Sequence, residues 1–407
     1  MNYHSLSSLV RPLRVTPKAL YREARRSCIC IFLFFIATMH AHTESADYTF
    51  PVRVLLTKTD ENSPLNWSLY SPQGFVVEDL HDRSMREEIL NETIVISLKN
   101  GKLALNGRRC ASSKIRLISR DGYIKYEGCE YQGDMLVVMH DKAIHLINSV
   151  DLEDYIFSVV RWEGWPGWPL EVNRVFAIMC RTYVVNKVLI ERKKKRIFDI
   201  KNTNIHQTYK GVHSADHLRQ ALEDTRGVVM THKGAPIEAM YDACCGGVIP
   251  ALMQGVDFEK APYLKRAYGC PYCKKTKIYA WQTEYSVTAL SELLAQELGN
   301  AKITQIYVSK KDKAGVVQEL VVKTKLGMHT FPIKKIYALI KNIRSLCFDV
   351  IKKGKKIIFK GRGYGHHLGI CQWGVRQMVR EGWHYLEILK FYYIGVSFMN
   401  IQVVEGA

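Results

Sequence analysis

The sequence predicts an α+β protein with two or three domains. Three observations lead to this fold class: short apolar runs separated by turn signals fill residues 46–150, two helical patterns follow within 151–280, and helix and strand patterns alternate from 281 onward. A chain of 407 residues, 47% of them hydrophobic, can build that number of ordinary cores. Charged residues make up 24% of the chain, which does not suit extensive disorder.

The N-terminus predicts export. Basic residues between Arg11 and Arg26 precede an apolar run at 28–37, an order typical of a secretory signal rather than of a spanning helix. We therefore expect residues 1–42 to direct the protein to the periplasm or cell envelope. Because residues 39–42 make a poor cleavage site, an uncleaved anchor in the inner membrane stays open as the alternative.

The formal net charge of +19 predicts an anionic partner. Export argues against nucleic acid, so we expect no nucleic-acid binding and instead an anionic glycan or a membrane surface. For a single lysine run, such as 352–356, a solvated face is the simpler interpretation.

The β-rich domain, residues 46–150, is followed by the predicted catalytic region at 151–280. Asp151 predicts the cap of a helix whose apolar positions repeat every three or four residues until Gly164. A proline at position 169 suits the first turn of a second helix. Residues 226–242 then predict a hairpin.

Glu163 is the candidate catalytic residue. It lies between the two helical patterns among Trp162, Trp165 and Trp168, three of the seven tryptophans of the chain. A carboxyl group in an apolar, aromatic environment resists ionisation and can donate a proton near neutral pH. Indole faces also stack on sugar rings, so we expect acid chemistry on a glycan. A surface carboxylate beside packing tryptophans is the competing interpretation.

The C-terminal part divides in two. Residues 281–346 predict a small inserted α/β subdomain, and residues 347–403 predict a strand, a glycine-rich loop and a helix that complete the catalytic groove. The loop at 361–367 has the spacing G-x-G-x-G rather than the G-x-G-x-x-G of a dinucleotide site. We expect it to let a bulky polymer approach the backbone.

Nine of the eleven cysteines follow the predicted signal, and an odd number precludes complete intramolecular pairing. Cys270 and Cys273 form a CxxC, which could join Cys244, Cys245 and His206 in a zinc site, form a local disulfide, or stay as thiols. The spacing leaves these alternatives open, and the metal ligands stay unknown at this stage.

Five segments of the chain occur in a recognisable order: WEGWPGWPLEVNRVFAIMCRTY, HQTYKG, YDACCGG, APYLKRA and GRGYGHHLGICQWGV. They resemble the motifs of the SpoIID (stage II sporulation protein D) family of peptidoglycan lytic transglycosylases, which includes the LytB-type amidase enhancers. The resemblance covers residues 50–400. It implies cleavage of the bond between N-acetylmuramic acid and N-acetylglucosamine. Because the sequence offers no evident second carboxylate, we expect the muramic acid 6-hydroxyl to act as the nucleophile and to give a 1,6-anhydro product.

The resemblance implies roles for six side chains. Glu163 matches the catalytic acid, and Arg181 matches an arginine that holds substrate or stabilises developing charge. The residues that match the substrate-binding positions are Tyr263, Lys265, His366 and Gln372.

Several positions depart from the family pattern. Gly164, His367 and Cys371 stand where the family usually has Met, Gly and Ser. Metal-binding members carry a cysteine where this sequence has His206, so the resemblance argues against the family's own zinc site and implies no required cofactor. A zinc site at the CxxC would be a different arrangement.

The implied partners are peptidoglycan glycan strands, in cell-wall remodelling or division. The positive charge suits strands stripped of their stem peptides, because the lactyl carboxylates of such strands are exposed. A non-enzymatic enhancer that binds peptidoglycan and activates a cell-wall amidase stays open as the alternative.

Overall fold

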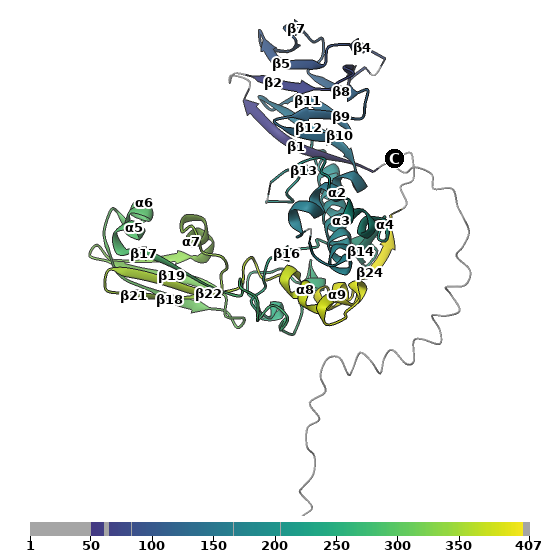
Figure 1. The fold of residues 1–407 in the computed structure, drawn as a ribbon. Coiled ribbons are helices and arrows are strands. Elements are labelled where there is room, and N and C mark those ends of the chain that lie inside the picture. The colour runs from purple at the N-terminus through teal and green to yellow at the C-terminus, as the bar shows by residue number, and fades with distance from the viewer. Residues whose placement is uncertain (1–49, 61–64, 83, 166, 204, 402–407) are drawn as a thin grey trace, which may run out of the picture. The chain divides into compact units, whose positions relative to one another are not determined.

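The computed structural model describes residues 50–60, 65–82, 84–165, 167–203 and 205–401 (Figure 1). Helices account for 25% and strands for 38%, so the predicted α+β fold class is confirmed. The predicted signal or anchor, residues 1–42, lies outside the described residues. In the described part of the chain, no helix has the length and apolarity needed to cross a bilayer.

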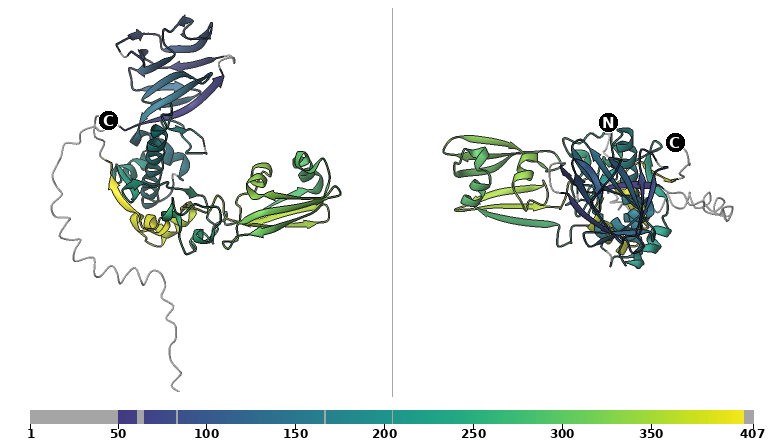
Figure 2. Two further views of the ribbon diagram at one scale, coloured as in Figure 1. Left: turned by 180° about the vertical axis from the view of Figure 1, so that it is seen from behind. Right: turned by 90° about the horizontal axis from the view of Figure 1, so that it is seen from above.

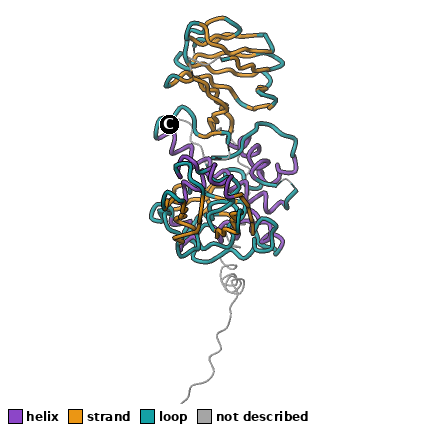
Figure 3. Tube along the Cα trace, turned by 90° about the vertical axis from the view of Figure 1, so that its left-hand side faces the viewer, coloured by secondary structure: helices purple, strands orange, loops and turns teal. Residues whose placement is uncertain are grey.

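Two sheets make up the first part of the described chain, which Figure 3 draws as strands and loops. The larger sheet has the order β13 (Ile200–Lys201), β1 (Pro51–Asp60), β12 (Ala143–Asp151), β11 (Asp134–His140), β8 (Lys114–Ser119), β3 (Phe75–Asp79) and β4 (Arg86–Ile89). The smaller sheet has the order β10 (Cys129–Gln132), β9 (Tyr123–Tyr126), β2 (Asn66–Tyr70), β5 (Thr93–Lys99), β6 (Lys102–Leu105) and β7 (Arg108–Arg109).

Alternating side chains explain why these segments form strands that share a core. In β8 every second residue is buried, as expected when one face of a strand packs inward. Leu117 and Val137 of the larger sheet belong to the same buried cluster as Leu69 and Ile96 of the smaller one. The cluster continues into the helices that follow, so the sheets support the helical region directly.

Strand β12 leads into helix α2 (Leu152–Glu163) without a loop. Asp151 caps the helix as predicted, because one of its carboxylate oxygens accepts a hydrogen bond from the Glu153 N–H at 2.8 Å. The other oxygen accepts from the Phe50 N–H at 3.2 Å, which ties the cap to the start of β1.

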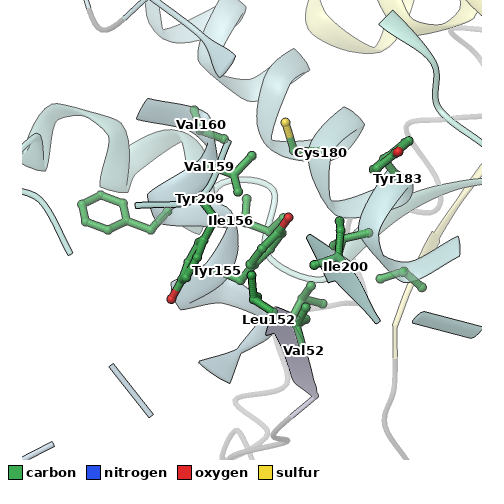
Figure 4. Packing of buried hydrophobic residues seen from close by; sticks show 14 of the residues in the cluster. Val52, Leu152, Tyr155, Ile156, Val159, Val160, Cys180, Tyr183, Ile200 and Tyr209 are labelled. Atoms are coloured by element: carbon green, nitrogen blue, oxygen red, sulfur yellow. The ribbon is translucent and has the colours of Figure 1, made fainter. Parts of the chain in front are cut away.

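Helix α3 (Leu170–Lys193) follows α2 and packs against it (Figure 4). Tyr155 of α2 is fully buried, and its ring stacks on Tyr209 with 5.2 Å between centroids. The Tyr155 hydroxyl donates to the side-chain oxygen of Gln207 at 3.0 Å, so this buried polar group is satisfied. The packing fixes α2 against the segment that follows α3.

The chain after α3 forms short elements that pair with the C-terminus. They are η1 (Asp216–Leu218), α4 (Arg219–Glu223), β14 (Val228–His232), β15 (Ala235–Pro236), β16 (Tyr241–Asp242), η2 (Pro250–Leu252) and η3 (Pro262–Leu264). The predicted hairpin is β14 with β15. Strand β24 (Ser397–Asn400) pairs with β14, and β16 runs parallel to β23 (Ile370–Cys371). Helices α8 (Gln372–Arg380) and α9 (Tyr385–Tyr392) follow β23.

The inserted segment contains two three-stranded sheets with the orders β17–β22–β21 and β18–β19–β20. Its elements are β17 (Ala280–Ser286), α5 (Val287–Leu293), α6 (Ala295–Leu298), β18 (Ile303–Lys311), β19 (Val317–Thr324), β20 (Met328–Pro332), α7 (Ile333–Leu339), β21 (Phe348–Lys353) and β22 (Lys356–Arg362). In Figure 2, α5 and α7 lie against these strands. Trp281, Leu320 and Phe359 belong to a core of its own. The predicted end at residue 346 is too early, because β21 and β22 complete the sheet that β17 begins.

Candidate functional site

Glu163 is the last residue of α2, and three segments hold it in place. One carboxylate oxygen, Oε1, accepts a hydrogen bond from the backbone N–H of Thr208 at 2.5 Å. The other, Oε2, accepts from the hydroxyl of Tyr241 at 2.8 Å. The backbone carbonyl of Glu163 accepts from Nε2 of Gln372 at 2.8 Å. Both ends of the residue are therefore fixed by groups that are far away in sequence.

Gly164 ends the helix and explains one departure from the family pattern. Its N–H donates to the carbonyl of Val160 at 3.0 Å, and its backbone is extended. A Cβ atom at this position would lie 2.8 Å from the same carbonyl oxygen, closer than real Cβ contacts come. Glycine therefore lets the chain leave the helix directly after Glu163.

The loop that carries Thr208 is itself anchored. The side-chain amide of Gln207 donates to the carbonyl of Cys180 at 3.4 Å, and the hydroxyl of Tyr209 donates to Asn148 at 2.6 Å. Gly211 has a φ of +71°, and a Cβ there would lie 1.9 Å from the carbonyl oxygen of Glu130. These contacts keep the Thr208 N–H directed at Glu163.

Tyr241 begins β16, and its neighbours are fixed by two further tyrosines. Tyr393 donates to the carbonyl of Met240 at 2.7 Å, and Tyr263 accepts from the N–H of Glu238 at 3.0 Å. Burial, and then the neighbouring Cys180 and Glu163, raise the pKa of the Tyr241 phenol well above its usual value. The phenol stays protonated and can donate to the carboxylate.

Three indole rings lie together: those of Trp165 and Trp168, which follow Glu163 in the chain, and that of Trp373 in α8. We call them the tryptophan face. The rings of Trp165 and Trp168 stack with 6.1 Å between centroids, and Trp373 meets Trp168 edge-on at 5.4 Å. Trp165 is 53% exposed. Such an exposed aromatic surface can take up the apolar side of a ring-shaped ligand.

Cations accompany these aromatic rings. The guanidinium of Arg376 lies 5.2 Å from the ring centroid of Trp373. On the other side of Glu163 in the chain, Trp162 is exposed, with the Lys210 ammonium 4.4 Å and the Arg161 guanidinium 5.1 Å from its ring centroid. Aromatic rings with cations beside them suit a ligand with both ring faces and anionic groups.

Arg181 is not where a substrate-binding residue would be. Its side chain is fully buried and forms a two-pronged ion pair with Glu153, at 2.8 Å and 2.6 Å. It also donates to the carbonyl of Val228 at 3.3 Å. This arginine therefore joins α2, α3 and β14 in the interior, and its implied role, to hold substrate or to stabilise developing charge, stays a prediction.

Tyr263 in η3 and Lys265 directly after it occupy different environments. Tyr263 is buried, and its hydroxyl bonds to the segment that carries Tyr241, so its position suits a supporting role rather than the predicted contact with substrate. The Lys265 side chain is exposed and accessible to a ligand.

The two predicted residues of the closing loop also differ. His366 is exposed, and its Nδ1 accepts from the Leu368 N–H at 3.1 Å, which fixes the ring. Gln372 is buried and bonds to the backbone of Glu163, so it positions the candidate acid instead of meeting substrate as predicted. His367 has a φ of +70°, a left-handed conformation that explains why a glycine is usual at this position in the family.

Glu238 is a second carboxylate that the sequence did not single out. It stands three residues before Tyr241 and pairs with the Lys187 ammonium at 2.6 Å. Burial, and then the charges of Glu238 and Glu163, raise the pKa of the Tyr183 phenol, so both carboxylates act on the same phenol.

Four buried thiols form a compact group: Cys245, Cys270, Cys273 and Cys371. Their sulfur atoms lie within 4.8 Å of one another. Cys270 and Cys273 of the CxxC belong to this group together with Cys245, as in the zinc site that the sequence left open. Cys371 takes the place of the suggested Cys244 and His206.

Some functional positions were missed at the level of sequence. Tyr241 and Thr208 lie in the quoted segments YDACCGG and HQTYKG, but no local signal marks the hydroxyl and the N–H that reach Glu163. Trp373 carries a clearer signal, since it is an aromatic residue directly after Gln372 within the quoted segment GRGYGHHLGICQWGV.

Two family models match the chain. Residues 140–232, which run from β11 to β14 and include Glu163, match SpoIID, described as stage II sporulation protein. Residues 263–369, which include the inserted segment, match a domain of unknown function, DUF8618.

Several curated proteins are similar to this chain. An uncharacterized protein of Brachyspira hyodysenteriae is 28% identical over 87% of this chain and 94% of its own length. Stage II sporulation protein D of Bacillus amyloliquefaciens is 25% identical over 64% of this chain and 78% of its own length. The amidase enhancer of Bacillus subtilis is 24% identical over 75% of this chain and 50% of its own length.

The buried position of Arg181 makes a testable prediction. Arg181→Met leaves the Glu153 carboxylate without its ion-pair partner, so we expect the free energy of unfolding to fall by about 3–5 kcal/mol in urea titrations. The matched control is Arg174→Met on the same helix, whose ion pairs with Glu171 and Asp224 are partly exposed and whose loss costs about 1 kcal/mol or less. An Arg181→Met protein as stable as the wild type, but defective in its function, would restore the predicted substrate contact.

Proposed function

Because the chain belongs to the SpoIID/LytB family, and a function in the cell wall follows from that, we propose that it is a lytic transglycosylase of peptidoglycan with Glu163 as its catalytic acid and base. The observation that carries this proposal is the placement of Glu163. A carboxylate at a helix end, fixed through both oxygens and through its own carbonyl, is the kind of preorganised group that proton transfer requires.

The two carboxylate oxygens of Glu163 have different partners. The Thr208 N–H can only donate, so Oε1 acts as an acceptor in either protonation state. The Tyr241 hydroxyl can donate or accept, so it tolerates a proton on Oε2. We therefore assign the transferred proton to Oε2.

The proposed reaction uses Glu163 twice, first as an acid and then as a base. Glu163 first protonates the glycosidic oxygen between N-acetylmuramic acid and N-acetylglucosamine, and the bond from that oxygen to C1 breaks. The muramic acid 6-hydroxyl then bonds to C1 and returns its proton to Glu163. The products are a 1,6-anhydro-muramic acid end and a free 4-hydroxyl, and the enzyme is regenerated without a cofactor.

The surroundings of Glu163 support a glycan as the ligand. The tryptophan face offers flat apolar surface for sugar rings, and the cations at Lys210 and Arg376 suit anionic groups along the same strand. In peptidoglycan without stem peptides those groups are the exposed lactyl carboxylates. We therefore propose peptide-stripped strands as the preferred substrate.

The site of action follows from the substrate. Peptidoglycan lies outside the cytoplasm, so the proposal includes export to the periplasm or cell envelope through residues 1–42, with retention at the inner membrane if that segment is not cleaved.

A second candidate function is that of a peptidoglycan-binding amidase enhancer. The observation in its favour is the similarity to the Bacillus subtilis amidase enhancer, which extends over 75% of this chain. In that case the tryptophan face would bind glycan, and Glu163 would have no chemical role.

Replacing the candidate acid separates the two functions. We expect Glu163→Gln to lower the rate of glycan cleavage by about 100-fold or more, because the amide cannot transfer a proton. The measurement is mass spectrometry of products released from purified peptidoglycan, both intact and stripped of peptides. The matched control is Glu223→Gln, an exposed carboxylate on α4 that should leave cleavage unchanged.

Three results of that experiment would count against the proposal. Undiminished release of anhydro products by the Glu163→Gln protein would remove Glu163 from the mechanism. Activity seen only with an added amidase, and insensitive to Glu163, would favour the enhancer. Products with ordinary reducing ends would instead indicate hydrolysis.

The tryptophan face predicts a separate effect on binding. Trp165→Ala removes an exposed stacking surface, so we expect affinity for insoluble peptide-stripped peptidoglycan to fall by about 2- to 10-fold, or roughly 0.5–1.5 kcal/mol. Co-sedimentation measures the change. Tyr337→Ala, which removes another exposed aromatic side chain, on α7, is the control, and equal losses in both variants would argue against a specific binding surface.

A further inference from the structure

Four cysteines from three separate segments converge in the interior. Cys245 follows β16, Cys270 and Cys273 form the CxxC before β17, and Cys371 ends β23. All four are buried, and their sulfur atoms lie within 4.8 Å of one another. Convergence of this kind from distant parts of the chain requires a physical reason.

The spacing fits a tetrahedral metal ion. Four sulfurs at the usual Zn–S distance of about 2.3 Å stand about 3.8 Å apart along each edge of a tetrahedron. The sulfur atoms of Cys245 and Cys273 are 3.8 Å apart. A disulfide would need the sulfurs at about 2.05 Å and would join them only in pairs.

Hydrogen-bond donors already face these sulfurs. The backbone N–H of Cys245 donates to the sulfur of Cys371 at 3.3 Å, and the hydroxyl of Tyr392 lies 3.2 Å from the sulfur of Cys270. Donors of this kind stabilise thiolates, the form that binds metal. Buried thiolates also repel one another, and a divalent cation among them would offset that repulsion.

A glycine provides the room for one of these contacts. A Cβ at Gly374 of α8 would lie 2.2 Å from the Tyr392 hydroxyl oxygen and 3.0 Å from the sulfur of Cys270. Any larger residue would push Tyr392 or Cys270 away. The residues around the four sulfurs are therefore packed tightly as well.

We propose that Cys245, Cys270, Cys273 and Cys371 bind one Zn²⁺ ion in a closed structural site. Soft thiolate ligands in a tetrahedral set favour zinc, and four protein ligands leave no position for water or substrate, so the ion has no direct part in catalysis. Its role is mechanical. Cys371 directly precedes Gln372, which bonds to the carbonyl of Glu163, and Cys245 follows β16, which carries Tyr241.

The ion would thus hold together the two strand ends that position the candidate acid. Strands β16 and β23 pair over only two residues each, through Tyr241 with Ile370 and Asp242 with Cys371. So short a pair is weak by itself. A metal bond to Cys371 at one strand and to Cys245 beyond the other would keep the pair closed.

Metal analysis of the purified full-length protein tests the proposal. We expect about one zinc ion per chain by elemental mass spectrometry, and loss of that zinc in Cys273→Ser and Cys371→Ser. The control is Cys347→Ser. Cys347 is a buried cysteine outside the group, so this variant protein should still contain one zinc ion per chain. Zinc retained in the two group variants, or iron in its place, would overturn the proposal.

A second measurement on the wild-type protein covers variants that fail to fold. X-ray absorption at the zinc edge should show four sulfur neighbours at about 2.3 Å. Nitrogen or oxygen neighbours would overturn the assignment. Metal-free protein in which mass spectrometry finds the four cysteines joined as two disulfides would also overturn it. Neither readout depends on glycan cleavage, so the result stands apart from the proposed enzymatic function.

Discussion

The site depends on the hydrogen bond between the side chain of Gln372 and the carbonyl of Glu163. This bond links the end of α2 to the start of α8, two segments more than two hundred residues apart. A helix end has carbonyl groups without partners inside the helix, and they must be satisfied from outside. Here the partner is the first residue of α8, directly after β23, and the neighbouring strand β16 brings the Tyr241 hydroxyl to the same glutamate.

This dependence explains why the motif residues divide into two kinds. Gln372, Tyr263 and Arg181 are buried and hold backbone segments in place, while Lys265 and His366 are exposed. A motif records which residues occur together but not which of them face solvent. The resemblance implied that Arg181 holds substrate or stabilises developing charge, and its bonds to Glu153 and Val228 place it in the packing of α2, α3 and β14.

Local patterns predicted the elements well. The Asp151 cap and the helix end at Gly164 depend on neighbours within a few residues, and the sequence displays these neighbours. The sequence shows no comparable local signal for contacts between distant segments. The hydrogen bond from Tyr241 to Glu163 depends on the pairing of β16 with β23. The proximity of Cys371 to the two cysteines of the CxxC depends on the same pairing. The boundary at 346 was misplaced for the same reason, since β22 pairs with β17 across the whole inserted segment.

Hydrogen exchange at the end of α2 tests the dependence on Gln372 most directly. In Gln372→Leu, the amides of residues 160–164 should exchange faster than in the wild type, because the last turn loses its external partner. Gln377→Leu, on the same helix but bonded to the exposed Glu381, should leave that exchange unchanged. Equal protection of these amides in Gln372→Leu and in the wild type would contradict the account.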